Sequence, residues 1–312
     1  MRETHFWPGN PVSYTTTKMT MRFGDQVVGI GSAFVMRFAG KYALVTNWHV
    51  LSGRSPIDER CLSAHGGIPD RASFHVTLSK KGVKDGASTE TLHFKQIEVP
   101  LYRSADFEEP VWLDERTPDN QADYAVILLE EWVPELEDGK HSLRCIEAGK
   151  VTLKLGVKPS LRVKVEDINH FYPPIGNQVF ITGYPAGIEP SGIFPIWKAG
   201  TIASEPSVGM VLGGVKTDDV LLVDGLTRAG MSGSPVVCLQ KAGDLCFTDD
   251  GVQVSADKDG PLLVGVYAGR EGVTAFEADM ALGRVWKVGA IERLLSHAIR
   301  AGMQPQAASS HD

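Results

Sequence analysis

The chain has 312 residues, of which 43% are hydrophobic and 22% are charged. This composition is ordinary for a globular protein with a large core, and it excludes a mainly disordered or collagen-like chain. The formal net charge is −7, with 31 Lys and Arg residues against 38 Asp and Glu residues. A nucleic-acid partner held by phosphate neutralisation is therefore not expected.

The amino terminus, MRETHFWPGNPVSYTTTK, lacks the apolar core and the small-residue cleavage site of a secretory signal. No apolar stretch reaches the roughly 20 residues that a bilayer-spanning helix needs. The four cysteines, Cys61, Cys145, Cys238 and Cys246, show no CxxC or Cys/His zinc spacing. We therefore expect a cytoplasmic protein with reduced thiols, no membrane contact and no bound metal or cofactor. A disulfide between Cys238 and Cys246 is the alternative if the two face each other across a hairpin.

In chain order, the sequence is a succession of short β-prone runs that turn residues separate. The first is a predicted hairpin over residues 26–46, with Ala39-Gly40 at its turn. Later runs rich in Val, Ile, Leu and aromatic residues lie at 91–102, 123–129, 177–184, 220–225, 234–240 and 262–269. Helical periodicity is nearly absent between them. The pattern favours an all-β sandwich or pair of barrels over alternating βα units.

Two further kinds of segment complete the chain. The connections 52–72 and 103–120 carry Gly, Pro and charge, and we expect them to be surface loops. Near the end, apolar residues recur at three- and four-residue steps, which predicts a helix. These residues are Val288, Ile291, Leu294, Leu295, Ala298 and Ile299. The residues after Gly302 have no apolar period and are expected to form a frayed tail.

Ser232 is the candidate nucleophile. It lies in AGMSGSP (229–235), where glycines on both sides permit a tight backbone that presents a side chain and two N–H groups to one point. The amides of Gly230 and Ser232 would then form an oxyanion hole. The alternative is a simple turn between strands, because Gly, Ser and Pro dominate turns.

His49 and Asp123 are the candidate base and acid. His49 follows the apolar run YALVT, where rigid structure would hold a base, and Asp123 opens DYAVILL, where a carboxylate would be partly desolvated. Taken singly, His49 is better explained as a core histidine, and Asp123 as a turn residue at the end of a strand. An α/β-hydrolase would run serine, acid, histidine and would need GxSxG and helices between strands. The order here is histidine, aspartate, serine, in a β-rich chain.

These segments resemble the trypsin-like, chymotrypsin-fold serine peptidases, whose His, Asp and Ser lie in the same order. The resemblance is carried by TNWHV around His49, DYAVILL around Asp123, GMSGSPVV around Ser232, GIGSAFV (29–35), VFITGYP (179–185) and LVGVYAG (263–269). It implies two six-stranded antiparallel β-barrels followed by a helix. We accordingly expect an amino-terminal extension (1–25), a first barrel (26–140), a second barrel (141–285), a helix (286–302) and a tail (303–312).

The resemblance implies a serine endopeptidase that cleaves peptide bonds of a protein or peptide substrate through an acyl-enzyme. It also places the base of the specificity pocket at Leu226 and Thr227, which suggests an apolar or shallow pocket. The alternative is a pocket that prefers Lys or Arg, if a small difference in the loop brings the carboxylate of nearby Asp224 into it. The strand formed by Val266, Tyr267, Ala268 and Gly269 is expected to pair with an extended substrate, with Gly269 leaving space for a side chain.

Where zymogen-activated family members carry an aspartate, this chain has Met231. Activation by cleavage at the amino terminus is therefore not expected, and we expect a stand-alone catalytic unit. Two alternatives stay open: an inactive relative that binds peptides or proteins, and an esterase of the same fold. The sequence does not identify a regulatory protein partner.

Overall fold

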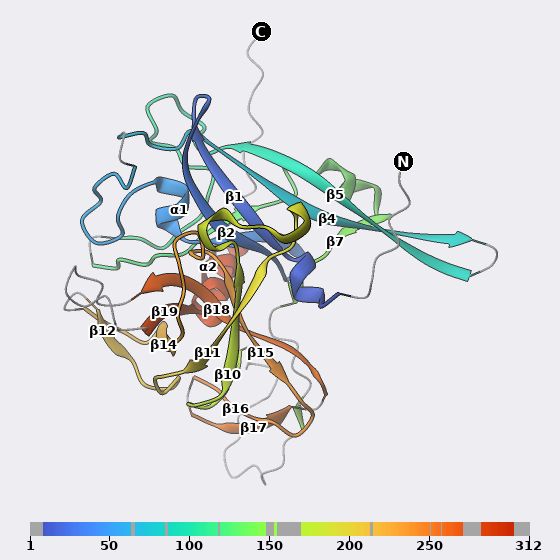
Figure 1. Ribbon diagram of the computed structural model, residues 1–312, viewed down its shortest axis with the longest axis vertical. Helices are drawn as coiled ribbons and strands as arrows, with labels where there is room; N and C mark the ends of the chain where they lie inside the picture. The colour runs from blue at the N-terminus through green and yellow to red at the C-terminus, as the bar shows by residue number, and fades with distance from the viewer. Residues whose placement is uncertain are drawn as a thin grey trace.

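The computed structural model describes residues 9–63, 66–84, 87–117, 119–147, 153–154, 170–212, 215–249, 251–256, 258–270 and 282–302 (Figure 1). The expected tail at 303–312 lies outside these residues, as do residues 148–152 and 155–169 of the expected second barrel. In the described part of the chain, strands dominate, which confirms the prediction of a mainly β protein.

The amino-terminal half forms one eight-stranded sheet, with its main strands in the order β5-β4-β1-β2-β3-β6, while β7 pairs with β4 and β8 pairs with β2. The strands are β1 (Thr16–Phe23), β2 (Gln26–Phe38), β3 (Lys41–Thr46), β4 (Arg71–Lys84), β5 (Ala87–Pro100), β6 (Ala125–Leu128), β7 (His141–Leu143) and β8 (Ile146–Glu147). The predicted hairpin over residues 26–46 is confirmed, because β2 and β3 pair antiparallel. At its turn, Ala39 and Gly40 both have positive φ.

The first half departs from the predicted closed six-stranded barrel. Among the described residues, the edge strands β5 and β6 do not pair with each other. The chain between them fills the gap irregularly: Val111 N donates to Leu101 O at 3.0 Å, and Leu113 forms an isolated bridge with Val126. A period-two pattern shows which face of a strand is buried, but not whether two sheet edges meet.

Strand β1 also differs from its expected place in an amino-terminal extension. It pairs with β2 along its length and with β4, and it buries Met19 and Met21. Polar residues separate its apolar ones, so the run TTKMTMRF carries a weaker strand signal than a continuous apolar segment.

The carboxy-terminal half contains a closed antiparallel barrel, β10-β11-β14-β19-β18-β15. Its strands are β10 (Gln178–Gly183), β11 (Ile196–Ile202), β14 (Val220–Asp224), β15 (Pro235–Gln240), β18 (Gly260–Arg270) and β19 (Leu282–Lys287). Small sheets beside it contain β9 (Leu153–Lys154), β12 (Met210–Leu212), β13 (Val215–Thr217), β16 (Leu245–Phe247) and β17 (Gln253–Ala256). The barrel confirms the prediction for this half.

The described residues contain the α-helices α1 (Trp48–Ser52), just after β3, and α2 (Val288–Arg300), just after β19. The predicted carboxy-terminal helix is confirmed, and Ile291, Leu294, Leu295 and Ala298 of α2 are buried as its period requires. Figure 1 shows α2 behind the strands, close to both halves. No described helix is long and apolar enough to cross a membrane.

One hydrophobic core joins the two halves. It contains Phe34 and Val126 of the first sheet together with Val236 of the second barrel and Leu295 of α2. All four cysteines are free thiols, so the alternative of a disulfide between Cys238 and Cys246 is not realised.

Candidate active site

The pairing of β3 with β6 brings the segments of His49 and Asp123 close together. The antiparallel ladder between β3 and β6 ends at Thr46 opposite Ala125, so the residues that follow β3 lie beside those that precede β6. His49 Nδ1 lies 2.7 Å from Asp123 Oδ2 and 3.0 Å from Oδ1. This contact occupies one ring nitrogen and leaves Nε2 as the nitrogen available to accept a proton.

Asp123 is held both at its carboxylate and at its backbone oxygen. Asp123 is 1% exposed, and its Oδ1 also accepts a hydrogen bond from the backbone N–H of His49 at 3.0 Å. The side chain of Asn47 donates to the backbone oxygen of Asp123 at 2.6 Å. A buried carboxylate with these donors has one orientation, and it therefore gives the imidazole one orientation as well.

The loop that carries Ser232 is anchored on β2 of the first sheet. Ser32 N donates to Ser232 O at 2.8 Å, and Ser32 Oγ donates to Gly230 O at 2.7 Å. A Cβ added to Gly31 would lie 2.9 Å from the side chain of Val50 and 3.4 Å from Ser232 O. The serine loop and the helix that carries His49 therefore contact the same glycine of β2.

Two glycines give this loop its shape. Gly230 has φ +90° and Gly233 has φ +88°, values that L side chains rarely adopt. A Cβ on Gly233 would lie 1.8 Å from Ser32 O and 2.3 Å from Thr46 Oγ1, which leaves no room for a side chain. Met231 between them is fully buried in the shared core, so this position holds an apolar side chain instead of a buried acid.

The N–H groups of the loop divide into two sets. Those of Met231, Gly233 and Ser234 donate to backbone oxygens within 3.2 Å. Those of Gly230 and Ser232 have no hydrogen-bond acceptor among the described residues. Two free amides two residues apart on a glycine-shaped loop are the donors that a developing oxyanion needs.

The structure brings His49 and Asp123 into direct contact, and it places Ser232 beside β2, where Ser32 N donates to the Ser232 carbonyl oxygen. In the part of the chain that is described, no hydrogen bond joins Ser232 Oγ to His49 Nε2. Apo enzymes commonly show loose contacts at this position, which tighten only when substrate is bound.

The residues proposed for substrate binding fall into two groups. Thr227 and Tyr267 are buried, and their hydroxyl oxygens lie 2.5 Å apart, so these side chains are engaged with each other. Val266 is buried too and pairs with Pro235 and Trp286 inside the barrel.

Leu226, Ala268 and Gly269 are the more accessible members of the set. Leu226 is 51% exposed. Ala268 and Gly269 lie where the β18–β19 register shifts between Tyr267 and Arg270, and a Cβ on Gly269 would have no atom of the described residues within 4 Å.

Sequence reasoning did not single out three residues that shape this site: Ser32, Thr46 and Asn47. Thr46 Oγ1 donates to Ser32 O at 2.7 Å, so these two residues hold together the strands on which the serine loop rests. Asn47 and Thr46 lie in the TNWHV segment and Ser32 lies in GIGSAFV. The motifs therefore include these residues, but the hydrogen-bond partners of Ser32, Thr46 and Asn47 are evident only from the three-dimensional structure.

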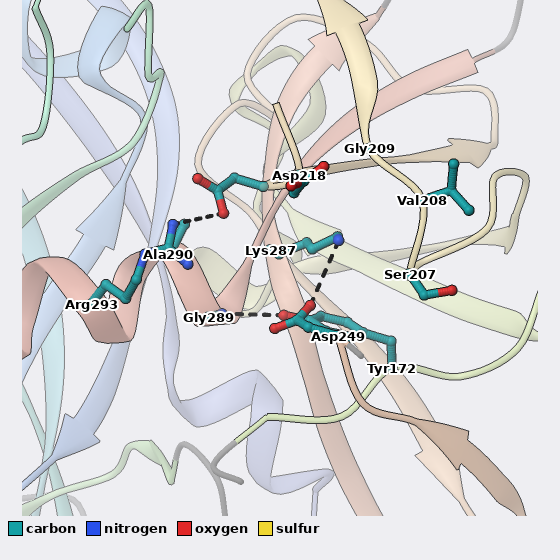
Figure 2. Close-up of a pocket in the computed structure, with 11 residues that line it drawn as sticks. Tyr172, Ser207, Val208, Gly209, Asp218, Asp249, Lys287, Gly289, Ala290 and Arg293 are labelled. Carbon is teal, nitrogen blue, oxygen red and sulfur yellow. Dashed lines mark hydrogen bonds and ion pairs between the residues drawn. The ribbon is translucent and has the colours of Figure 1, made fainter. Parts of the chain in front are cut away.

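A separate cavity of about 450 Å³ lies at the start of α2, and none of the predicted site residues lines it. Figure 2 shows Lys287 pointing toward Asp249 and Gly289 beside Tyr172. Arg293 Nη2 lies 2.6 Å from Asp219 Oδ1, and Lys287 Nζ lies 3.7 Å from Asp249 Oδ1. The buried Lys287 and the exposed Arg293 thus both have carboxylate partners within the protein.

His170 extends this charged cluster. Burial lowers the pKa of His170, but the carboxylates of Asp249 and Glu292 outweigh burial and raise that pKa to about 9. Burial lowers the pKa of Lys287 and raises that of Glu292. Among the described residues, no group of three or more His, Cys, Asp or Glu side chains is arranged to hold a metal ion.

Comparison with known proteins gives structural similarities only. No protein-family model and no curated protein sequence matches the chain. The inactive form of the Rv3671c protease, a protein of M. tuberculosis H37Rv, is 14% identical over 92% of this chain and 89% of that chain, with a TM-score of 0.41. The serine endoprotease from Yersinia pestis is 14% identical over 94% of this chain and 65% of that chain, with a TM-score of 0.43. Deg5 is 16% identical over 94% and 92% of the two chains, with a TM-score of 0.42.

Proposed function

We propose that this protein is a serine endopeptidase in which Ser232, His49 and Asp123 act as a catalytic triad. The observation that carries the proposal is the pair of contacts from His49 Nδ1 to the buried Asp123 carboxylate, at 2.7 Å and 3.0 Å. They leave Nε2 without a partner among the described residues. Gly31 of β2 faces both Val50, which follows His49, and the loop that carries Ser232, whose Gly230 and Ser232 amides have no described acceptor. A base, its orienting acid and oxyanion donors are the parts that nucleophilic serine chemistry requires.

In the proposed reaction, Ser232 Oγ attacks the carbonyl carbon of a peptide bond while His49 Nε2 takes the hydroxyl proton. The N–H groups of Gly230 and Ser232 stabilise the negative oxygen. His49 then gives the proton to the leaving nitrogen, the C–N bond breaks, and an acyl-enzyme remains. Water, deprotonated by the same imidazole, hydrolyses the ester and restores Ser232. Asp123 keeps the imidazole in one tautomer throughout.

We further propose that the substrate backbone lies along Ala268 and Gly269 as an added strand, with Leu226 at the base of an apolar specificity pocket. The exposure of Leu226 and the absence of described atoms within 4 Å of a Cβ at Gly269 support this placement. Thr227 and Tyr267 would act behind the pocket, through the bond between their hydroxyls. A peptide-library cleavage profile tests the pocket: we expect apolar residues before the cleaved bond, and a profile dominated by Arg or Lys would implicate Asp224 instead.

Labelling by a fluorophosphonate probe tests the catalytic proposal directly. We expect the wild-type protein to be labelled on Ser232, and Ser232→Ala and His49→Gln to lose the labelling. Ser234→Ala is the matched control, since Ser234 is fully buried two residues away. A folded wild-type protein that takes up no label would favour an inactive, peptide-binding relative.

The esterase alternative requires a separate measurement. Turnover of a peptide amide is compared with that of the matching ester on the same acyl group. Hydrolysis of both would support a peptidase. Hydrolysis of the ester alone would overturn the endopeptidase proposal while retaining the triad.

A further inference from the structure

Arg116 lies in the irregular chain between β5 and β6, and its largely covered side chain contacts the residues that precede His49 and Asp123. The side chain is only 11% exposed. The centre of its guanidinium lies 4.0 Å from the ring centroid of Trp48, and Nη1 donates to Ala122 O at 3.3 Å. Nη2 donates to Pro56 O at 3.0 Å, in the chain that follows α1.

Two of the residues that Arg116 contacts are sequence neighbours of the proposed base and acid. Trp48 immediately precedes His49, and Ala122 immediately precedes Asp123. One planar group therefore stacks on the residue before the base and hydrogen-bonds to the residue before the acid. It ties together the two segments that must stay in register for the imidazole to meet the carboxylate.

The strand pairing alone does not supply this register. The β3–β6 ladder ends at Thr46 and Ala125, before either catalytic segment is reached. Beyond the ladder, the hydrogen bond from Asn47 to Asp123 O and the contacts of Arg116 connect the two segments outside the triad contact itself. From this geometry we propose that Arg116 is a positioning residue for the His49–Asp123 pair; the proposal rests on the function proposed above.

The chemistry of the side chain explains why arginine fits this place. A guanidinium is flat, so it stacks on an indole face while its edge donates several hydrogen bonds at fixed angles. A lysine ammonium at the same depth keeps the charge but has neither the flat face nor the fork. Arg116→Lys is therefore the informative variant, because it preserves most of the buried aliphatic chain and the charge.

The test compares Arg116→Lys with Glu59→Gln. Glu59 is the exposed partner of Arg116, at 3.3 Å and 64% exposure, so its loss removes the ion pair and leaves the contacts with Trp48 and Ala122 in place. Two experiments are done on each variant. The first measures kcat and KM on an ester substrate. The second records the low-field proton NMR signal of the His49 Nδ1–H that is bonded to the carboxylate, assigned with His49→Gln. Thermal melting of each variant shows that it is folded at the assay temperature.

We expect Arg116→Lys to lower kcat roughly 10- to 100-fold with little change in KM, since small misplacements of catalytic groups have effects of this size. The low-field signal should broaden or disappear in this variant. Glu59→Gln should retain the kcat and the low-field signal of the wild type. An unchanged kcat and signal in a folded Arg116→Lys protein would overturn the proposal, even if its melting temperature falls.

The NMR readout separates this proposal from the proposed function. If the wild-type protein takes up no fluorophosphonate label, the hydrolase proposal fails, but the signal still reports whether Arg116 maintains the His49–Asp123 contact. Should Arg116→Lys fail to fold, Trp48→Leu tests the same contact from its other side. A normal signal in folded Trp48→Leu would then count against positioning by this stacked pair.

Discussion

The buried carboxylate of Asp123 determines both the orientation and the tautomer of the imidazole in the proposed site. Its oxygens accept hydrogen bonds from both the ring Nδ1 and the backbone N–H of His49. In Asp123→Asn, the amide oxygen can still accept from the backbone, but the NH2 group then faces Nδ1. That arrangement favours the imidazole tautomer with its proton on Nε2, which cannot accept a proton from Ser232.

We therefore expect Asp123→Asn to fold normally and to lose about 10³- to 10⁴-fold in kcat on an ester substrate, the size of effect known for triads of this kind. Asp119→Asn, an exposed acid in the same segment, is the control and should keep full activity. Activity in Asp123→Asn within tenfold of the wild type would show that this acid does not orient the base.

The two glycines Gly233 and Gly243 offer a matched pair for testing how tightly the serine loop is held. Both have strongly positive φ, +88° and +93°, so alanine is strained at either position. At Gly243 a Cβ meets nothing within 4 Å, whereas at Gly233 it meets Ser32 O at 1.8 Å.

From this comparison we expect Gly243→Ala to lose about 1 kcal/mol of unfolding free energy, the ordinary cost of the backbone conformation. Gly233→Ala should lose at least roughly 2 kcal/mol more and should lose fluorophosphonate labelling as well. Urea unfolding of both variants provides the measurement. Equal losses would mean that the loop moves away from β2 at little cost.

At the scale of elements, the continuous apolar strands were predicted well, but the alternating strands β1 and β4 were not. The run 234–240 is buried on nearly every residue, and it forms β15 as expected. Strand β4, in contrast, buries Ala72, Phe74 and Val76 with polar residues between them, and was not predicted. Half of such a strand faces away from the core, so its composition is close to that of a loop.

The element α2 takes part in a charged cluster whose effect on stability depends on pH. His170 is bonded to Asp249 and lies 3.5 Å from Glu292 of α2, and its pKa is raised from 6.5 to about 9. The folded protein therefore holds this proton more tightly than the unfolded chain does. The stabilisation is fully present below about pH 6.5 and is lost as the pH rises through about 9.

We expect the wild type to lose on the order of 2 kcal/mol of unfolding free energy between pH 6.5 and pH 9.5 relative to His170→Gln. The comparison with this variant matters because Lys287, whose pKa is lowered by burial, acts with the opposite sign at high pH in both proteins. Urea unfolding at a series of pH values gives the difference. Parallel stability curves for the two proteins would contradict a protonated His170.

At the scale of the whole molecule, sequence could identify the order of the candidate residues but not the contacts that support them. Asp123 and His49 stood out because each lies at the end of a recognisable strand. Arg116 lies in a polar connection without periodicity, and its contact with Trp48 depends on how that connection folds across the edge of the first sheet. The closure of the second barrel and the open edge of the first sheet likewise depend on strand edges, which leave no periodic signal in the sequence.

The hydrophobic core that the two halves share couples their unfolding. Tyr124 of the first half packs on Trp286 of the second, with ring centroids 5.4 Å apart, and both belong to the cluster that also contains Met231. Separating the halves would expose this cluster to water, at a cost of about 25 cal/mol for each Å² of apolar surface. Independent unfolding of either half is therefore unfavourable.

We expect a single calorimetric transition, with a van't Hoff enthalpy close to the calorimetric one. The experiment uses Ser232→Ala, so that self-cleavage of unfolding molecules does not distort the scan. In this background Trp286→Leu should lower the temperature of the whole transition, because it weakens the contact that both halves share. Two resolved transitions, with Trp286→Leu shifting only one of them, would show that the halves are separate folding units despite their common core.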